Sequence, residues 1–485
     1  MSNGSKAATP SDRDATREVG VAHRSEEAGQ RPQSKGAAQS KLLGGGNTAA
    51  PEADQPVSPK LAELVARARK EGRLTNVVQF VDEELLRLAF RSLRKRAAPG
   101  VDGQRYEDYA ENLDANLRDL HQRLRTGRYR APVVRRVYIP KANGGRRPLG
   151  ITTIEDRVVQ KAVAWVLSAV FEQDFLDCSH GFRPGRSAHT ALHRLREGMM
   201  QHWVKYVVEV DVVGYFDHVN WAWLAKFLRH RVNDGGLLRL VNKWLRAGVM
   251  EDGVVVHTEE GTPQGGPVSP ILANVYLHYV LDLWFERRFK KTCRKWAELT
   301  RYCDDFVAAF QDQADAERFR REVEERLAAF GLKVAPEKTA IRHFDGNLLK
   351  GPGRPAERPE TFTFLGFTHF IAKTRAKKLN IIRTPSVHAR ARFLRRVAEW
   401  LQVHRHVGPG LQREHLTKML SGFYQYFGLW GCTQKLAGVR FRMYWLWRQT
   451  LRRRSDMGRR TSDWMTLFTK SWFRLPQPRL TQPWV

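Results

Sequence analysis

The sequence predicts an α+β fold, on the evidence of two patterns. Stretches with the apolar period of amphipathic helices lie between short apolar runs, and the two kinds alternate in no regular order. The runs typical of β-strands are 133–140, 146–151, 204–211, 253–257, 299–310 and 361–370. Repeated strand–helix–strand units would alternate regularly, so the irregular order favours α+β over a parallel α/β sheet.

The composition divides the chain into three parts. Residues 1–56 are rich in Gly, Ala, Ser, Gln and Pro and are electrically neutral, so we expect a disordered tail. Residues 57–370 contain the predicted strands and form the expected α+β domain. Residues 371–485 carry 24 Lys/Arg against 4 Asp/Glu and half of the 14 Trp. A helical bundle that is merely basic is the alternative, but so much charge favours a separate all-α domain that grips RNA or a duplex and ends in a short basic DNA-binding tail. Its expected helices are 387–405, 411–427 and 434–454.

The net charge of +31 indicates a polyanionic partner, and nucleic acid fits best. The alternative is a cationic protein of membrane surfaces. No apolar stretch has the length of a membrane span, and the N-terminus has no secretory signal, so we expect a soluble cytoplasmic protein that does not bind membranes. The four cysteines form no C-x-x-C pair, which argues against a zinc site or a disulfide framework.

Two acidic clusters carry the chemistry. Asp211 closes the apolar run 206–210, and Asp304 and Asp305 follow Tyr302-Cys303 in an expected hairpin turn. Taken alone, each has an ordinary explanation, since Asp is common at strand ends and in turns. A strand end and a turn can meet at one point, and carboxylate oxygens are the ligands that Mg²⁺ prefers. On a chain this basic, the pair of clusters predicts nucleotidyl transfer with two metal ions, in a polymerase that copies RNA into DNA.

A basic hairpin is predicted at 139–150, with its turn at 143–145. Lys141 and Arg147 flank this turn. They could neutralise a triphosphate before phosphoryl transfer. A hairpin whose basic side chains are only solvated is the equal alternative.

Two glycines follow a glutamine in the segment 262–267. Gly265 permits a backbone to approach a ligand closely, here a base pair, and Gln264 supplies hydrogen bonds. The alternative is a plain turn before a helix that begins near Pro270.

The segment Gly181–Ser187 precedes a helix that Ser187 could cap. Its two arginines, Arg183 and Arg186, suit phosphate contacts, which helix capping alone does not explain.

In this order the motifs resemble those of the reverse transcriptase–maturase proteins that bacterial group II introns encode. The resemblance extends over about 75–480 and implies a right-hand polymerase fold, with fingers and palm in 57–370 and a helical thumb or maturase domain in 371–485. The motifs that carry it are Ala98–Gly103, Ile139–Ile151, Gly181–Ser187, Asp211–Phe216, Pro263–Gly266, Tyr302–Asp305, Pro336–Thr339 and Phe364–Phe367.

The resemblance also implies the metal ligands. Asp211, Asp304 and Asp305, with Val212, would hold two Mg²⁺ per active site, for which Mn²⁺ can substitute. One ion would activate the primer 3′-hydroxyl, and the other would bind the incoming dNTP and the leaving pyrophosphate.

Further residues are implied to contact the substrates. The basic pair of the 139–150 hairpin resembles the triphosphate contacts of the fingers, and Tyr215 resembles the aromatic gate that excludes a ribose 2′-hydroxyl. Gln264 and Gly265 would lie along the nascent base pair, and Lys338 near the primer backbone.

The implied partners are group II intron RNA, a duplex of RNA template and DNA primer, dNTPs and target DNA, with the oligomeric state left open. Residues 420–427 match a recurrent maturase helix. The protein is expected in the cytoplasm, and at the nucleoid when it acts on DNA. Cys303 stands where Ala is common in the family. The chain also lacks the Cys-paired, His-rich endonuclease module of many relatives, as in class C proteins, so we do not expect it to cut target DNA.

Two alternatives remain at this point. One is an RNA-binding splicing factor without catalysis, against which the intact Asp211, Asp304 and Asp305 argue. The other is a reverse transcriptase of another lineage, such as a retron, diversity-generating or CRISPR-associated enzyme. The Ala98–Gly103 element and the maturase-like tail favour the intron-encoded type.

Overall fold

A computed structural model describes residues 58–140, 146–251, 254–256, 260–261, 265–349, 357–374, 376–454 and 473–481. The expected disordered tail, 1–56, lies outside the described residues. The chain divides into two compact units at 347/348, and the larger unit spans Pro51–Asn347. In the described part of the chain, no helix has the length and apolar character needed to cross a membrane.

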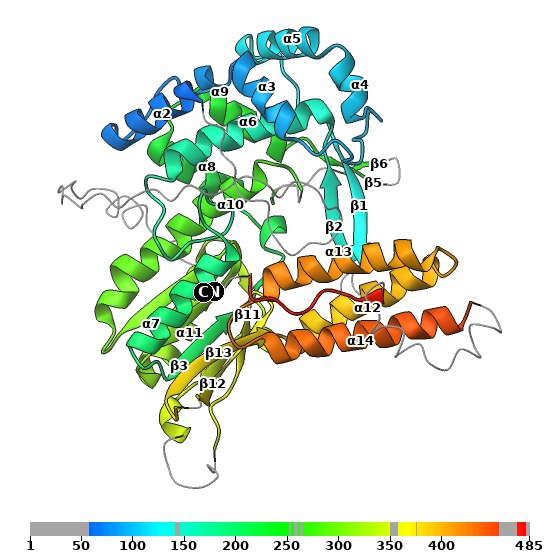
Figure 1. Ribbon diagram of the computed structural model, residues 1–485. Helices are drawn as coiled ribbons and strands as arrows, with labels where there is room; N and C mark the ends of the chain where they lie inside the picture. The colour runs from blue at the N-terminus through cyan, green and yellow to red at the C-terminus, as the bar shows by residue number, and fades with distance from the viewer. Residues whose placement is uncertain are drawn as a thin grey trace, which may run out of the picture. The chain divides into compact units, whose positions relative to one another are not determined.

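Helices form one end of the larger unit, around the central helix α6 (Figure 1). Helix α6 is apolar over most of its surface, with Val158, Val163 and Val170 fully buried, as expected of a helix largely enclosed by others. Helices α2 and α3 pack against α6. The helices of this region are α2 (Pro59–Lys70), α3 (Glu83–Ser92), α4 (Tyr106–Glu111), α5 (Leu113–Arg125), α6 (Ile154–Phe171), α8 (Trp221–Arg231) and α9 (Gly235–Leu245).

A four-stranded sheet of order β2-β1-β5-β6 adjoins these helices. Strands β1 and β2 pair antiparallel, with Pro140 opposite Arg146, which agrees with the hairpin predicted there. The run predicted at 253–257 contains the edge strand β6. The strands are β1 (Val134–Pro140), β2 (Arg146–Ile151), β5 (Val249–Glu251) and β6 (Val254–Val256).

A second four-stranded sheet, of order β10-β3-β8-β7, contains the predicted strand end and the predicted hairpin. All its pairs are antiparallel. Its central strands are rich in Val, Ala and Phe, and are largely buried, because helix α11 packs against them while α7 packs against β7. The elements are β3 (Tyr206–Val210), β7 (Ala297–Tyr302), β8 (Asp305–Phe310), β10 (Ala340–His343), α7 (Ala188–Gln201) and α11 (Gln313–Ala329).

Three local features complete this unit. The strands β4 (Val212–Val213) and β9 (Lys333–Val334) form a short antiparallel pair. Helix α10 (Ser269–Leu277) is fully buried over most of its length and continues into a π-helical turn, His278–Asp282. Ser187 caps helix α7 by accepting a hydrogen bond from the backbone N–H of Thr190, as predicted.

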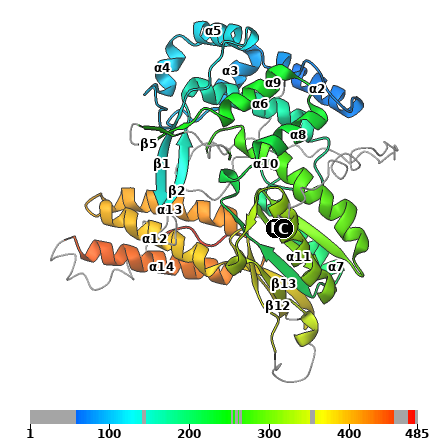
Figure 2. The ribbon, with the colours of Figure 1, turned by 180° about the vertical axis from the view of Figure 1, so that it is seen from behind.

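The described part of the smaller unit begins at Leu348 and combines a three-stranded antiparallel sheet with three helices (Figure 2). The sheet has the order β11-β12-β13, with β11 (Phe362–Phe364), β12 (Phe367–Lys373) and β13 (Leu379–Pro385). A domain boundary at 370 was therefore wrong. It would cut β12, which hydrogen-bonds to a strand on each side, and the sequence analysis missed β13 altogether.

The helices of this unit agree with the three predicted from periodicity. They are α12 (Val387–Val403), α13 (Pro409–Phe427) and α14 (Thr433–Arg452), and each packs against the other two. Gln412 is completely buried where they meet. Its side chain accepts a hydrogen bond from the Trp447 indole (2.8 Å) and donates to the His404 carbonyl (2.8 Å), so this polar group is fully used inside the bundle.

Candidate active site

The pairing of β3 with β8 brings the two acidic clusters to one end of the sheet. Val210 lies opposite Phe306, so the antiparallel register continued by one residue sets Asp211 opposite Asp305. Cys303 and Asp304 form the two-residue turn that joins β7 to β8, and Asp305 is the first residue of β8. Carboxylates that lie far apart in the sequence thus come from adjacent backbone positions.

The turn itself has a tight geometry. Cys303 has a φ of 61°, a positive value of the kind that the first central position of a type II′ hairpin turn requires. A residue other than Gly is strained there by about 1 kcal/mol. Cys303 is buried, Asp304 is half-buried and Asp305 is exposed, so the turn presents its acidic side to solvent and its thiol to the interior.

A buried polar cluster supports the turn on its interior side. The Arg301 guanidinium binds both carboxylate oxygens of Asp282 at 2.5 and 2.7 Å. It also donates to the Asn274 side chain and to the backbone carbonyl of Cys303, both at 3.0 Å. Asn274 in turn donates to the Gly181 carbonyl at 2.7 Å. Arg301, Asp282 and Asn274 are fully buried, so this cluster fixes the turn backbone from inside the protein.

Electrostatics keep these groups in defined protonation states. Burial alone would lower the pKa of Arg301, but the charge and hydrogen bonds of Asp282 outweigh it, and the pKa is raised. Burial raises the pKa of the Cys303 thiol, and the charge of Asp304 raises it further. Cys303 is therefore a neutral thiol at physiological pH, which is a poor metal ligand and a poor nucleophile.

Asp211 contacts a cation of the protein. The Lys338 ammonium lies 2.6 Å from a carboxylate oxygen of Asp211, and this hydrogen bond and charge raise the pKa of Lys338. Both side chains are well exposed. The Asp211 carbonyl accepts a hydrogen bond from the Ala335 N–H, and because successive carbonyls of a strand alternate in direction, the carbonyl of Val212 points to the opposite side.

These residues supply the hard oxygen donors that divalent cations prefer. Within the described ranges, no three His, Cys, Asp or Glu side chains are already gathered as a metal site. The Asp211 carboxylate instead forms an ion pair with the Lys338 ammonium. The backbones of the acidic residues are therefore adjacent, but the charge of Asp211 is balanced by a protein group.

Tyr215 does not occupy the expected position of an aromatic gate. Gly214 has a φ of 51° and starts a 3-10 turn that directs Tyr215 into the core. The Tyr215 side chain is buried, and its hydroxyl donates to the Ala273 carbonyl at 2.9 Å. Tyr215 thus cannot contact a nucleotide in this conformation. The next residue, Phe216, remains partly exposed and lies edge-on to the Tyr215 ring.

The other predicted substrate contacts are only partly covered by the structure. Lys141 and Gln264 lie outside the described residues, as does the side chain of Arg147. Gly265 has a φ of 115°, and a Cβ there would lie 2.4 Å from the Gly150 carbonyl of β2. A close backbone approach does require this glycine, but the neighbour seen here is β2.

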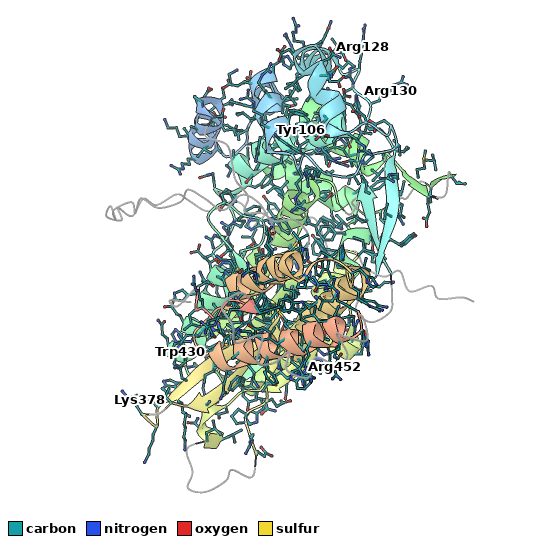
Figure 3. The ribbon with its side chains drawn as sticks, turned by 45° about the vertical axis from the view of Figure 1, so that its right-hand side comes forward. Tyr106, Arg128, Arg130, Lys378, Trp430 and Arg452 are labelled. Carbon is teal, nitrogen blue, oxygen red and sulfur yellow. The ribbon has the colours of Figure 1, made fainter. Side chains whose placement is uncertain are left out.

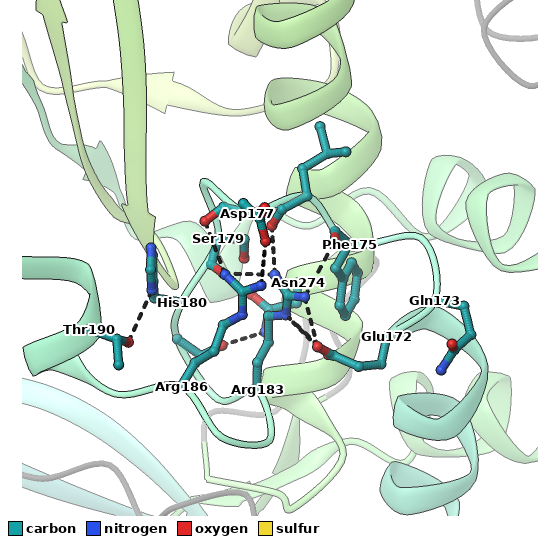
Figure 4. Close-up of polar contacts among 12 residues, drawn as sticks. Glu172, Gln173, Phe175, Asp177, Ser179, His180, Arg183, Arg186, Thr190 and Asn274 are labelled. Atoms are coloured by element: carbon teal, nitrogen blue, oxygen red, sulfur yellow. Dashed lines mark hydrogen bonds and ion pairs between the residues drawn. The ribbon is translucent and has the colours of Figure 1, made fainter. Parts of the chain in front are cut away.

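Arg183 and Arg186 both bind groups of the protein itself (Figure 4). Arg183 is buried, binds the Glu172 carboxylate and donates to backbone carbonyls in the loop 175–179. Arg186 binds the Asp177 carboxylate at 2.6 Å. The expectation that both bind phosphate was wrong for Arg183, because its guanidinium is enclosed by protein acceptors.

The cluster of Arg301, Asp282 and Asn274 was not predicted from the sequence. One signal was available, since Arg301 is a charged residue two positions before the turn, in a predicted strand that is otherwise mostly uncharged. A buried charge requires a partner. The identity of that partner, Asp282 on a π-helical turn, depends on tertiary structure and has no local signature.

The chain has extensive similarity to known proteins. Residues 139–369 match the family described as reverse transcriptase (RNA-dependent DNA polymerase). Protein YkfC of Escherichia coli K12 is 33% identical over 284 residues, which are 52% of this chain and 74% of YkfC. The group II intron-encoded protein LtrA of Lactococcus lactis is 40% identical over 183 residues, 36% of this chain and 30% of LtrA.

An uncharacterized 91 kDa protein in the cob intron of Schizosaccharomyces pombe is 31% identical over 248 residues, 50% of this chain and 30% of that protein. The chain therefore spans most of YkfC but under a third of the two intron-encoded relatives. The matched region encloses the whole sheet that carries Asp211, Asp304 and Asp305, and the match confirms the fold class predicted from the sequence. The chain belongs to the reverse transcriptases, the RNA-dependent DNA polymerases, and part of it is similar to a protein that a group II intron encodes.

Proposed function

We propose that Asp211, Asp304 and Asp305 form the catalytic centre of this polymerase and hold two Mg²⁺, with the Val212 carbonyl as a further ligand. The observation that carries the proposal is the pairing of Val210 with Phe306, a register that, continued by one residue, sets Asp211 opposite Asp305. When bound, the metal ions activate the primer 3′-hydroxyl and stabilise the charge that develops on the phosphates. Mn²⁺, which also prefers oxygen ligands, is the expected substitute.

In this proposal Lys338 balances the charge of Asp211 until a metal ion binds. Its ammonium balances the charge of Asp211 at 2.6 Å, and its long, exposed side chain can leave that position when another cation arrives. The released ammonium is then available to a phosphate of the primer, as the sequence motif suggested.

Phe216 takes the part that the sequence analysis gave to Tyr215. It follows Asp211 by five residues, and it stays partly exposed while Tyr215 points into the core. A ring beside the metal-binding end of the sheet can exclude a 2′-hydroxyl by its bulk, so we assign the choice of deoxynucleotide to Phe216.

The remaining partners are inferred from the charge of the chain and from its similarity to known proteins. Lys141 and Arg147 suit the triphosphate of the dNTP, and Gln264 suits the nascent base pair. The strongly basic residues 371–485 suit an RNA template–DNA primer duplex and the parent intron RNA. Assistance to splicing, insertion into target DNA, and a location in the bacterial cytoplasm and nucleoid belong to the same proposal.

Primer extension on an RNA template tests the catalytic centre. Asp304→Asn is expected to lower the extension rate on the order of 10⁴-fold, as the loss of a group central to catalysis does. The same change at the exposed Asp114 is the control and should leave the rate unaltered. Because the basic C-terminal residues are separate from the sheet, RNA affinity should stay within about twofold in both variants.

Two outcomes would contradict the proposal. Equal losses of RNA affinity and extension in Asp304→Asn would show a folding defect instead of a catalytic one. If the unmodified protein forms no product with Mg²⁺ or Mn²⁺ while it binds RNA, the non-catalytic splicing factor would be the better description.

A further inference from the structure

Helix α14 exposes two large aromatic side chains. Phe441 and Trp445 lie one helical turn apart and are 52% and 39% exposed. Their ring centroids are 6.2 Å apart and their planes are inclined by 74°. Met443 and Trp447 on the opposite face of the helix are completely buried and complete the bundle. The packing of the bundle therefore does not depend on the two exposed rings.

The same face of α14 is basic. The Arg448 guanidinium lies over the Trp445 ring, 5.1 Å from its centroid, and Arg442 and Arg452 lie on neighbouring positions of the helix surface. Residues 433–452 contain no Asp or Glu. In Figure 3, helix α14 extends between the labelled residues Trp430 and Arg452.

We propose that this aromatic and basic face of α14 binds unpaired RNA nucleotides, whose bases stack on Phe441 and Trp445 while the arginines contact the flanking phosphates. Aromatic rings interleaved with arginines are the means by which proteins hold single-stranded nucleic acid. The inference rests on the RNA binding proposed above and adds the kind of RNA segment that is bound.

The chemistry of the face favours this ligand over two others. Bases in a continuous duplex are stacked on one another, and their faces are not accessible to a protein ring, so a duplex would use the arginines alone. A second copy of this chain would bring a net charge of +31 to a face that is itself basic, and repulsion would oppose that contact. An RNA loop or single strand satisfies both the rings and the charge.

Paired variants test the role of the rings. The double change Phe441→Leu and Trp445→Leu removes both rings and keeps an apolar side chain with high helix propensity. The double change Phe441→Tyr and Trp445→Phe keeps aromatic rings and serves as the matched control. Fluorescence anisotropy then measures the affinity of the full chain for a short oligouridine and for a blunt RNA duplex at the same salt concentration.

The leucine variant is expected to bind oligouridine about tenfold or more weakly and to bind the duplex unchanged, since base–aromatic stacking contributes only to the single strand. The aromatic control should keep both affinities within about twofold. The salt dependence of oligouridine binding should be the same in all three proteins, because the arginines are intact.

Several outcomes would overturn the inference. The first is unchanged oligouridine binding by the leucine variant, and the second is an equal loss of affinity for the single strand and the duplex. The third is a lower melting temperature of the leucine variant, which would show that the rings are part of the fold. The fourth is self-association of the unmodified protein that the leucine variant loses. Primer extension by the unmodified protein keeps the two proposals apart. If extension occurs while the leucine variant binds oligouridine normally, the α14 inference fails and the polymerase stands.

Discussion

The side chain of Arg301 donates a hydrogen bond of 3.0 Å to the backbone carbonyl of Cys303, two residues further along the chain. This bond attaches the turn that bears Asp304 to a fully buried ion pair between Arg301 and Asp282. Asp304 and the adjacent Asp305 therefore rest on a rigid, fully buried support. Such a support holds reactive groups in place during catalysis without relying on their own contacts.

The buried ion pair should be far more important for stability than a surface pair. We predict that Asp282→Asn lowers the free energy of unfolding by about 3–5 kcal/mol, because it leaves the Arg301 charge buried without a counter-ion. The same change at Asp119, whose side chain is 64% exposed beside Arg123, should lower it by less than about 1 kcal/mol. Urea denaturation measures both. Similar losses in the two variants would contradict this account of the support.

Substitutions of the adjacent residues Tyr215 and Phe216 should have different effects, the first on stability and the second on the choice between dNTP and rNTP. Tyr215→Phe removes the hydrogen bond to the Ala273 carbonyl and should lower stability by about 1–2 kcal/mol while the preference for dNTP over rNTP stays unchanged. Phe216→Val should leave stability less affected and raise incorporation of rNTPs. Single-nucleotide incorporation assays give the preference. A change of preference only in the Tyr215 variant would restore the assignment made from the sequence.

Asp156 should make stability depend on pH. Burial raises its pKa to about 6, although Tyr129, Gln160 and Trp244 all donate hydrogen bonds to its carboxylate. The folded protein therefore takes up this proton at a higher pH than the unfolded chain does. Stability from this group is complete below about pH 4 and is lost as the pH rises through 6, by roughly 3 kcal/mol for a shift of about two pH units.

The change Asp156→Asn keeps the group neutral at every pH and tests this directly. The free energy of unfolding of the variant should equal that of the unmodified protein at about pH 4 and exceed it by about 2–3 kcal/mol at about pH 8. Chemical denaturation at several pH values gives the difference, in which the other titrating groups cancel. Asp114→Asn, at an exposed position, is the control and should show a flat difference. A flat difference for Asp156→Asn as well would refute the prediction.

Exposed and enclosed arginines should differ in their effect on RNA binding. Arg128 and Arg130 are exposed next to helix α5, as labelled in Figure 3, whereas the Arg183 guanidinium is enclosed by Glu172 and backbone carbonyls. Replacing Arg128 and Arg130 by Gln should reduce the slope of log affinity against log salt by about 1–2. Arg183→Gln should lower stability and leave the slope unchanged. A reduced slope for Arg183→Gln would mean that it reaches RNA after all.

The sequence predicted those parts of the site that depend on local structure. Asp211 ends a strand and Asp304 lies in a turn, and strand pairing in one register is enough to bring them together. The directions of Tyr215 and Arg183 were not predictable, because a 3-10 turn and a loop of carbonyl acceptors decide them. The domain boundary at 370 failed for a similar reason, since only the partner strands show that β12 belongs to the smaller unit.

The contact between Gly181 and the turn has a wider consequence. A Cβ on Gly181 would lie 2.5 Å from the Cys303 amide nitrogen, so the two backbones touch with no side chain between them. Two loops separated by more than a hundred residues of sequence are thus in direct backbone contact, and a shift of one would press on the other. Anything that displaces the Gly181 loop, whether a bound molecule or a distant substitution, would be transmitted to the acidic turn without any change in the acidic residues themselves.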